Sequence, residues 1–246
     1  MKDDVLIVTG AASGVGEAAV RLLAESGAKI VASDIDHQAL QKAEKRWGRH
    51  HEITTFTADL SKSDEVASLV DFAVSTYGTL NGIFNNAGVR DGTHFDELSP
   101  DSYHEHLDTN QHSVFYGMHY AASKMQELGA EGTIVNTASI RSYFGARKSF
   151  RYSAAKAAIV SMTQSGADAL AKDNIRVVGV APAFIDTGLL ASVPEERIER
   201  LKAKHLKGRL LTADEVARVV RFLFSEDSNA INGSTLLVDD GYLAVR

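Results

Sequence analysis

A tyrosine and a lysine, Tyr152 and Lys156, stand four residues apart in a stretch of helical character. Side chains at this spacing share one face of a helix. A phenol with its ordinary pKa of about 10 is a poor base at neutral pH, and a neighbouring ammonium lowers that pKa by stabilising the phenolate. Such a pair can exchange a proton with a substrate, although on its own it is also an ordinary solvated helix face.

Ser139 favours the catalytic interpretation. It follows the apolar run 133–137, which has the composition of a strand, and it precedes Tyr152 by thirteen residues. Its hydroxyl could hold a substrate oxygen in line with the phenol. The three side chains together predict acid/base chemistry at the oxygen of an alcohol or a carbonyl compound.

A glycine-rich turn follows the first predicted strand, 5–9, and opens a helix. It runs Thr-Gly-Ala-Ala-Ser-Gly-Val-Gly from Thr9 to Gly16. Glycines at such a junction let the backbone approach a pyrophosphate, which the positive end of the helix attracts. The spacing differs from the general G-x-G-x-x-G fingerprint, and glycine also occurs in turns for conformational reasons alone. The position between a strand and a helix is what predicts dinucleotide binding.

Asp34 ends the second predicted strand, twenty residues beyond Gly14. A carboxylate at this place accepts hydrogen bonds from the ribose hydroxyls of NAD and repels the additional phosphate of NADP. No Lys or Arg adjoins Asp34, and Ser13 stands where NADP-binding proteins often have a base. Asp34 could instead cap the helix that follows, but Asp36 is better placed for that role. We therefore predict NAD as the cofactor.

The elements that must position these groups alternate regularly along the chain. Short β-branched runs alternate with longer segments of helical periodicity, and the runs lie at 5–9, 29–33, 53–57, 82–85, 133–137, 176–180 and 235–238. This alternation indicates parallel strands with helical crossovers, and hence an α/β fold with helices on both faces of the sheet. No change of composition marks a domain boundary. We expect one doubly wound domain over 1–246, with ligands beyond the carboxyl ends of the strands.

The bulk composition excludes several kinds of site. The 246 residues contain no cysteine, which excludes disulfides, iron–sulfur clusters and thiolate zinc sites. A formal net charge of −6 argues against a general nucleic-acid or membrane-surface binder. No apolar run approaches the length of a membrane span. We expect a cytoplasmic protein that binds neither nucleic acid nor membranes.

Four of the nine histidines fall in one segment of helical character: His104, His106, His112 and His119. Their spacings of two, six and seven residues do not give a pair of metal ligands four apart on one helix face. We therefore expect these histidines to be exposed, and we predict no catalytic metal.

In this order, the motifs resemble those of the short-chain dehydrogenase/reductase family, in its branch of single-domain chains of about 250 residues. The resemblance covers essentially the whole chain. It rests on the turn of 9–16, Asp59-Leu60, Asn85-Asn86-Ala87-Gly88, Asn110, Ser139, Tyr152 with Lys156, the stretch from Pro182 to Thr187, and the closing Val238-Asp239-Asp240-Gly241. It implies a Rossmann-type domain with a seven-stranded parallel sheet. It also implies an enzyme that interconverts a secondary alcohol and a ketone by hydride transfer with a nicotinamide cofactor.

The resemblance assigns roles to individual residues. It implies that Tyr152 is the general acid or base, and that Lys156 lowers its pKa and binds the nicotinamide ribose. It implies that Ser139 orients the substrate oxygen and that Asn110 holds a water linking Lys156 to solvent. The residues expected around the cofactor are Gly10, Ser13, Gly14, Val15, Gly16, Asp34, Ile35, Asp59, Leu60, Asn86, Ala87, Gly88, Tyr152, Lys156, Pro182, Ile185 and Thr187.

One position departs from the family's pattern. Ala183 follows Pro182 where the family usually has glycine. Because alanine restricts positive φ, we expect a different pocket shape with cofactor binding retained.

The segment between Ser139 and Tyr152 carries four cations and no acidic residue: Arg141, Arg147, Lys148 and Arg151. In the family this loop borders the substrate pocket. The cations could bind a carboxylate or phosphate of the substrate, and a solvated loop or a contact between subunits is the alternative. Arg141 and Arg147, with Phe184, are the candidate substrate residues, and 184–207 resembles the family's substrate-binding lobe.

Two other functions stay open. One is a 3-oxoacyl-carrier reductase, a role that normally uses NADPH and against which Asp34 speaks. The other is a catalytically silent dinucleotide sensor, which the presence of both Tyr152 and Lys156 disfavours. The family commonly pairs two long helices, here near 101–128 and 152–171, across one two-fold axis, and its last helix and strand across another. We therefore expect a homotetramer.

Overall fold

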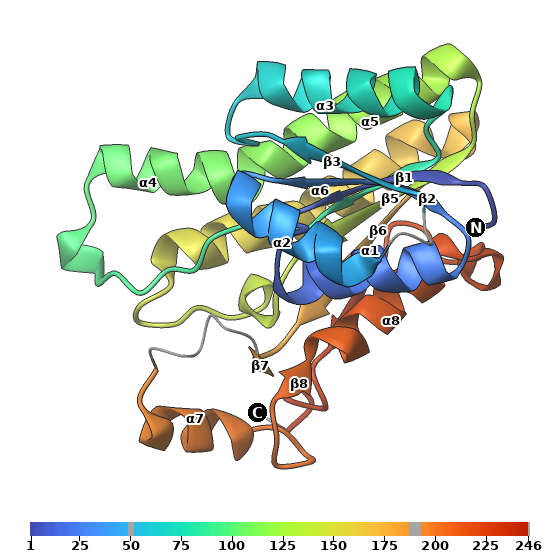
Figure 1. Ribbon diagram of the computed structural model, residues 1–246. Coiled ribbons are helices and arrows are strands. Elements are labelled where there is room, and N and C mark those ends of the chain that lie inside the picture. The colour runs from blue at the N-terminus through green and yellow to red at the C-terminus, as the bar shows by residue number, and fades with distance from the viewer. Residues whose placement is uncertain (49–51, 187–192, 246) are drawn as a thin grey trace.

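The computed structural model describes residues 1–48, 52–186 and 193–245. Its central element is a seven-stranded parallel sheet in the order β3-β2-β1-β4-β5-β6-β9 (Figure 1). The strands are β1 (Val5–Thr9), β2 (Lys29–Asp34), β3 (Ile53–Thr57), β4 (Gly82–Asn85), β5 (Gly132–Thr137), β6 (Ile175–Pro182) and β9 (Thr235–Val238). These are the seven predicted runs, so the doubly wound α/β fold is confirmed.

Helices cover both faces of this sheet, as expected for parallel strands. On one face lie α1 (Gly14–Glu25), α2 (His37–Trp47) and α8 (Ala213–Phe224), and on the other lie α3 (Ser63–Tyr77), α5 (Ser113–Leu128) and α6 (Phe150–Leu170) (Figure 1). The apolar side chains of each set form a separate buried cluster with one face of the strands. None of the helices in the described ranges is long and apolar enough to cross a membrane.

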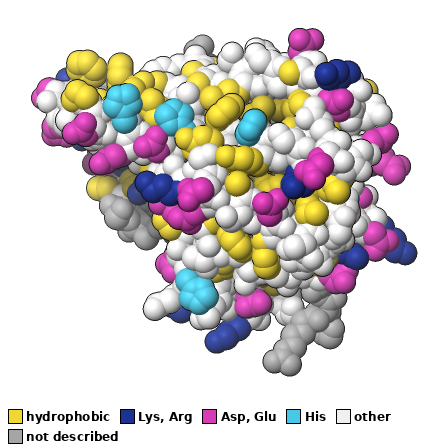
Figure 2. All heavy atoms as spheres, turned by 90° about the horizontal axis from the view of Figure 1, so that it is seen from above, with side chains coloured by type: hydrophobic (Ala, Val, Ile, Leu, Met, Phe, Trp, Pro, Cys, Tyr) yellow, Lys and Arg dark blue, Asp and Glu magenta, His cyan; other side chains and the backbone are white. Residues whose placement is uncertain are grey.

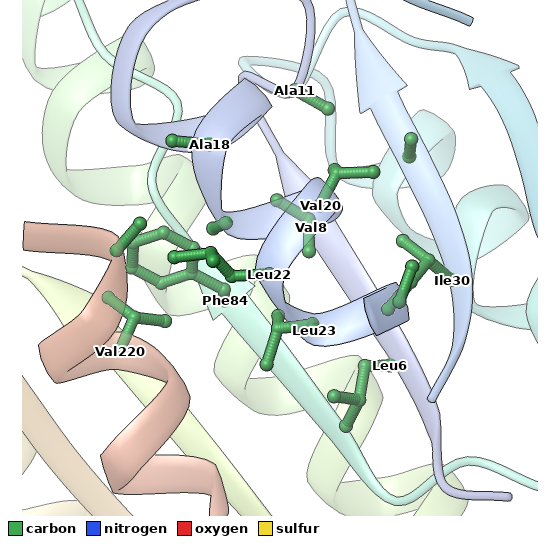
Figure 3. Packing of buried hydrophobic residues seen from close by; sticks show 14 of the residues in the cluster. Leu6, Val8, Ala11, Ala18, Val20, Leu22, Leu23, Ile30, Phe84 and Val220 are labelled. Atoms are coloured by element: carbon green, nitrogen blue, oxygen red, sulfur yellow. The ribbon is translucent and has the colours of Figure 1, made fainter. Parts of the chain in front are cut away.

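The core on the first face is built from small and branched side chains. Every residue of β1 is buried, which is typical of a central parallel strand. Figure 3 shows Leu22 of α1 beside Phe84 of β4 and Val220 of α8, while Leu23 faces the sheet. This packing seats α1 against the strands, and therefore fixes the glycine-rich turn that precedes it.

A chain of buried polar side chains ties α6 to the sheet on the second face. Asn85 donates from Nδ2 to Oδ1 of Asn136 at 2.9 Å, and Asn136 donates from Nδ2 to Oγ1 of Thr163 at 3.1 Å. Buried amides and hydroxyls need such partners. A Cβ on Gly117 would overlap Oδ1 of Asn85, so glycine lets α5 approach β4. These hydrogen bonds fix the position of α6, the helix that carries Tyr152, relative to β4 and β5.

The helix predicted near 101–128 contains a break in its regular winding. It consists of α4 (Pro100–Leu107), a π-helical turn (Asp108–His112) and α5. Ser99 caps α4 by accepting a hydrogen bond from the N–H of Ser102. A π-helical turn accommodates an additional residue in the helix, and it was not predicted from the sequence.

A two-stranded parallel sheet and a short helix lie below the main sheet in Figure 1. The strands are β7 (Ile185–Asp186) and β8 (Leu211–Thr212), and the helix is α7 (Glu195–Lys202). Thr212 and Glu215 form a capping box at the start of α8. The segment expected to form the substrate lobe, 184–207, comprises β7 and α7, and part of it lies outside the described residues.

Candidate active site

The glycine-rich turn lies at the carboxyl end of β1 and is tightly packed. Gly10 has a φ of +63°, in the left-handed region that favours glycine. A Cβ on Gly16 would overlap the carbonyl oxygen of Gly10. Both positions therefore require glycine, and the turn leads from β1 into α1 as predicted.

The amino-terminal end of α1 is open to a ligand. Ser13 precedes the helix with an extended backbone, is exposed, and makes no capping hydrogen bond with its side chain. The first N–H groups of a helix have no partner within it, and they carry partial positive charge. Gly14, Val15 and Gly16 form this first turn, which fits the pyrophosphate of a dinucleotide.

Asp34 ends β2 beside the glycine-rich turn. Its Oδ2 accepts a hydrogen bond from the N–H of Ala12 at 3.0 Å, and its Oδ1 accepts one from the N–H of Asp36 at 3.1 Å. These bonds hold the carboxylate at the edge of the turn. Asp36 caps α2 by accepting from the N–H of Ala39, as predicted. Ile35 is 66% exposed and leaves apolar surface next to the carboxylate.

Asp59 and Leu60 follow β3, and both side chains contact other residues of the protein. Oδ1 of Asp59 accepts hydrogen bonds from the N–H and the hydroxyl of Ser61, at 3.0 and 2.7 Å. Leu60 is buried in the core beneath α3. Both residues lie at the carboxyl end of the sheet, and their contact with a cofactor stays a prediction.

Asn86 and Ala87 continue from β4 and are tied to the end of β1. The N–H groups of both residues donate to Oγ1 of Thr9, at 2.9 and 3.1 Å, and Nδ2 of Asn86 donates to the Thr9 carbonyl oxygen. Gly88 is close-packed, since a Cβ there would lie 2.7 Å from Oδ1 of Asn110. This segment joins the glycine-rich turn to the other half of the site.

Ser139, Tyr152 and Lys156 meet at the carboxyl end of β5. Lys156 is 2% exposed and donates from Nζ to the carbonyl oxygen of Thr137 at 2.7 Å. Its Nζ lies 5.8 Å from the centre of the Tyr152 ring. The phenol of Tyr152 hydrogen-bonds with Ser139, whose hydroxyl also accepts from the N–H of Arg141 at 3.1 Å. The three residues singled out by type and spacing thus form one cluster.

Burial raises the pKa of Tyr152 above its ordinary value. The hydrogen bond with Ser139 and the positive charge of Arg141 act in the opposite direction without offsetting burial. From the sequence, Lys156 is expected to lower this pKa. In the structure the net shift is upward and the opposing cation is Arg141, while the Lys156 ammonium is directed at the Thr137 carbonyl.

Burial lowers the pKa of Lys156 to about 8. The cause is desolvation, because the surrounding protein stabilises the ammonium less well than water does. A lysine with this pKa is partly neutral near physiological pH. It can release and recover a proton in a range where exposed lysines stay charged.

Asn110 lies fully buried in the π-helical turn. Its Oδ1 accepts a hydrogen bond from the N–H of Val89 at 3.0 Å. Its Nδ2 donates to the carbonyl oxygen of His106 at 3.2 Å and lies 3.1 Å from Nε2 of the same histidine. The side chain joins the helix to the segment after β4, and its expected water-holding role toward Lys156 stays a prediction.

His106 lies beside Tyr152, a position not predicted from the sequence. It was expected to be exposed, but it is 4% exposed, and its ring meets the ring of Tyr152 edge to face with 6.2 Å between centroids. His104 and His119 are exposed as predicted. The available signal was the four-residue spacing of His106 and Asn110, which places both on one helix face. Among the described residues, no three His, Asp or Glu side chains are grouped to hold a metal ion.

Three of the residues expected around the cofactor lie at the end of β6 or after it. Pro182 is the last residue of β6, and Ile185 lies in β7. Ala183, which replaces the expected glycine, donates from its N–H to the carbonyl oxygen of Val238 at 3.0 Å. Thr187 lies outside the described residues.

Two of the three candidate substrate residues lie together. The guanidinium of Arg141 lies over the ring of Phe144, 4.7 Å from its centre, and 5.7 Å from the centre of the Phe184 ring. Both phenylalanines also contact the buried ring of Tyr242, with centroids 6.0 and 5.7 Å away. Arg147, the third candidate, is exposed on the loop.

Arg151, the last of the four cations between Ser139 and Tyr152, makes its hydrogen bonds with other residues of the protein. It donates to Oδ1 of Asp91 at 3.2 Å, to the carbonyl oxygen of Ser102 at 2.7 Å and to Oγ1 of Thr93 at 2.9 Å. The Asp91 side chain is wholly buried in this ion pair. Arg151 therefore fastens the segment after β4 to α4 and α6.

Known proteins match the chain along nearly its whole length. A family model described as enoyl-(acyl carrier protein) reductase matches residues 10–243. Cyclohexanol dehydrogenase of Acinetobacter sp. (strain SE19) is 37% identical over 240 residues, which cover 97% of this chain and 94% of that protein. The chain belongs to the short-chain dehydrogenase/reductase family.

Other members of this short-chain dehydrogenase/reductase family agree with the assignment. Cis-4-hydroxycyclohexanecarboxylate dehydrogenase of Sinomonas cyclohexanicum is 36% identical over 242 residues, covering 98% of this chain and 97% of that one. The crystal structure of levodione reductase superposes with a TM-score of 0.94, at 28% identity and complete coverage of both chains. The named relatives are dehydrogenases of alcohol groups, so the chain is an oxidoreductase of this family, whose dehydrogenases typically use nicotinamide cofactors.

Lys156 should titrate near pH 8 in this enzyme, because burial lowers its pKa to about 8. The measurement is an NMR titration of isotopically labelled lysine side chains, with the signal assigned through its loss in Lys156→Met. The exposed Lys148→Met variant is the matched control and should leave that signal in place. A lysine spectrum without a step near pH 8 would contradict the burial argument.

Proposed function

We propose that this chain is an NAD(H)-dependent dehydrogenase that interconverts a secondary alcohol and a ketone, with Tyr152 as its acid/base. The observation that supports it most is the meeting of Tyr152 with Ser139 and Lys156 at the carboxyl end of β5. The open end of α1 lies at the same edge of the sheet, two strands away at β1. In such folds this edge binds the ligands.

The proposed mechanism assigns the proton to Tyr152. During reduction its Oη donates a proton to the substrate oxygen, and during oxidation it accepts the proton of the substrate hydroxyl. Ser139, hydrogen-bonded to the phenol, holds the same oxygen. A bound nicotinamide would supply or accept the hydride. A buried phenolate is unfavourable without a neighbouring cation, and Arg141 and Lys156 are the cations beside it.

The proposed preference for NAD(H) over NADP(H) rests on Asp34. Each of its carboxylate oxygens accepts one backbone hydrogen bond and has a further lone pair for a ribose hydroxyl. A phosphate on that ribose would bring a second negative charge against the carboxylate. Ser13, exposed in the turn, provides no positive charge that would offset this repulsion. Ile35 would lie beside the adenine.

The proposed substrates are small cyclic secondary alcohols, including ones that carry a carboxylate. The relatives named above act, by their names, on cyclohexanol and on cis-4-hydroxycyclohexanecarboxylate. Phe144, Phe184 and Tyr242 provide ring surfaces for an apolar ring, and Arg141 lies on two of them with a charge suited to a carboxylate. We further propose that 184–207 is the substrate-binding lobe and that Arg147 is a second contact for an anion.

A 3-oxoacyl-carrier reductase is the second candidate. The family model that matches is described as an acyl-carrier reductase, and a 3-oxoacyl-[acyl-carrier-protein] reductase of Thermotoga maritima is 30% identical over 242 residues. Asp34 disfavours this role, which normally uses NADPH. A catalytically silent sensor of the dinucleotide is the third candidate, and the complete set of Ser139, Tyr152 and Lys156 disfavours it.

We also propose a homotetramer in the cytoplasm, where NAD(H) is available. Hydrophobic side chains lie among polar ones on the face formed by α3, α4 and α5 (Figure 2). Phe115 and Leu128 of α5 are exposed there, and Leu237 is exposed on β9, the edge strand of the sheet. Two faces of this kind suit the two symmetry axes of a tetramer.

Tyr152→Phe should lower kcat by a factor of about 10²–10⁴, the usual contribution of a positioned acid/base. NADH affinity should change little, because the ring remains in place. The measurement is absorbance of the reduced nicotinamide with cyclohexanone and a carboxylated cyclohexanone, and Tyr103→Phe on α4 is the control. Unchanged kcat in Tyr152→Phe would remove Tyr152 from the mechanism. NADH binding by the wild type without turnover of any ketone would instead favour the sensor.

Asp34→Ser should shift the ratio of NADPH to NADH affinity at least tenfold toward NADPH, which corresponds to about 1.4 kcal/mol. The reason is the loss of a negative charge from the position of the additional phosphate. The measurement is the Kd of each reduced cofactor by fluorescence. Asp36→Ser keeps a capping side chain two residues away and should leave the ratio unchanged. A wild type that prefers NADPH would overturn the assignment.

Arg141→Ala should raise KM for a carboxylated cyclohexanone at least about tenfold more than KM for cyclohexanone, which corresponds to the loss of one charge-assisted contact. The fall in kcat should be similar for both ketones, because the charge of Arg141 also acts on Tyr152. Arg147→Ala tests the second candidate in the same assay, and Lys148→Ala is the control. Equal changes of KM for the two ketones would refute the anionic substrate.

A further inference from the structure

His106 is a buried titratable group in the site that the proposed mechanism does not use. It lies in the last turn of α4, and its ring contacts the ring of Tyr152. A buried imidazole needs hydrogen-bond partners. Whether those partners donate or accept decides which of its two nitrogens carries a proton.

The side-chain amide of Asn110 determines whether Nε2 of His106 carries a proton. The backbone N–H of Val89 can only donate, so the Asn110 atom 3.0 Å from it must be the oxygen. The amide nitrogen of Asn110 therefore faces His106, 3.1 Å from Nε2, and an amide NH₂ can only donate. Nε2 must be an unprotonated acceptor. The ring is then neutral, with its proton on Nδ1.

The charges around the ring favour the neutral form. Burial lowers the pKa of His106, and the positive charges of Arg151 and Lys156, which face it from α6, lower it further. Asp91, from the segment after β4, acts in the opposite direction, but its carboxylate is already paired with Arg151. Tyr152 also faces the ring from α6 and is uncharged at neutral pH, because its pKa is raised.

Protonation of His106 would place two donors against each other. Nε2–H would face the NH₂ of Asn110 at a distance that now suits a hydrogen bond. The amide would have to turn or withdraw, and the N–H of Val89 would lose its acceptor. Val89 directly follows Gly88, which leaves no room for a Cβ against Asn110. The disturbance therefore reaches the segment 86–89, where the cofactor is expected to bind.

We propose that His106 is a positioning residue that makes cofactor binding depend on pH. Its unprotonated Nε2 holds Asn110, and Asn110 holds the segment 86–89 in the arrangement that accepts the dinucleotide. Protonation of His106 releases this segment. Because the group must be neutral to act, the arrangement is intact at neutral pH and is lost in acid. The use of NADH as a probe rests on the proposed function, whereas the hydrogen bonds themselves do not.

The first experiment needs no cofactor. In protein labelled with ¹⁵N at histidine, one ring should show Nδ1 protonated and Nε2 unprotonated at neutral pH, and this signal should be absent from His106→Gln. The ring should titrate below the ordinary histidine value of about 6.5. The backbone amide of Val89 should follow the same titration in the wild type and not in His106→Gln. A protonated Nε2 at neutral pH, or a Val89 signal that ignores the titration, would overturn the proposal.

The second experiment measures NADH affinity from neutral pH to below the pKa of His106 that the first experiment gives. His106→Gln keeps a side-chain acceptor near the position of Nε2 and cannot be protonated there. His106→Leu removes the acceptor. His104→Gln, an exposed histidine on the same helix, is the matched control.

The wild type and His104→Gln should lose NADH affinity as the pH falls below the pKa of His106, by about tenfold, or 1.4 kcal/mol, for each further pH unit. His106→Gln should bind NADH nearly as well as the wild type at neutral pH and keep that affinity in acid. His106→Leu should bind weakly at every pH. An unchanged acid loss in His106→Gln refutes the proposal even if the leucine variant folds poorly. If the wild type binds no NADH at any pH, the proposed function fails, and the Val89 titration still decides the role of His106.

Discussion

Parallel strands leave backbone N–H and C=O groups without partners where they end, and the need to satisfy these groups organises the site. The carbonyl oxygen of Thr137 accepts a hydrogen bond from the ammonium of Lys156, and the N–H of Val89 donates one to the amide oxygen of Asn110. The glycine-rich turn donates an N–H to Asp34. Lys156, Asn110 and Asp34 therefore complete backbone hydrogen bonds at one edge of the sheet. Their geometry depends on the paths of the backbone where the strands end.

This arrangement has a consequence for proton transfer. Lys156 is buried to reach the Thr137 carbonyl, and burial favours the uncharged form of both the lysine and the tyrosine. The phenol thus has a raised pKa while its neighbouring amine has a lowered one. A phenolate at Tyr152 requires positive charge close by, and Arg141 supplies it in this structure. These charges interact strongly, because buried groups are screened little by solvent.

Local signals made the fold predictable from the sequence. Runs of apolar and β-branched residues marked all seven strands of the sheet, and Asp36 caps its helix as expected. The spacing of His106 and Asn110 placed both on one helix face, but the burial of His106 was not predictable, because it depends on α6 and on the segment after β4. The role of Arg151 likewise depends on Asp91, sixty residues away in the chain. The π-helical turn contains Asn110, which accepts a hydrogen bond from the N–H of Val89, and no periodicity of the sequence reveals it.

In the proposed function, the residues that would recognise the cofactor are separate from those that would transfer the proton. Recognition of the substrate and proton transfer share one residue. Asp34 and Ile35 lie toward β2, away from Tyr152 along this edge of the sheet. In the proposed function, a substitution at either residue would therefore alter cofactor affinity without contacting the buried groups around Tyr152. Arg141 differs, because its guanidinium rests on the aromatic rings proposed to bind the substrate and its charge also acts on the phenol. A substitution of Arg141 would therefore also remove a charge that lowers the pKa of Tyr152. In the proposed function, the charge of the substrate and the acidity of Tyr152 are coupled through this one side chain.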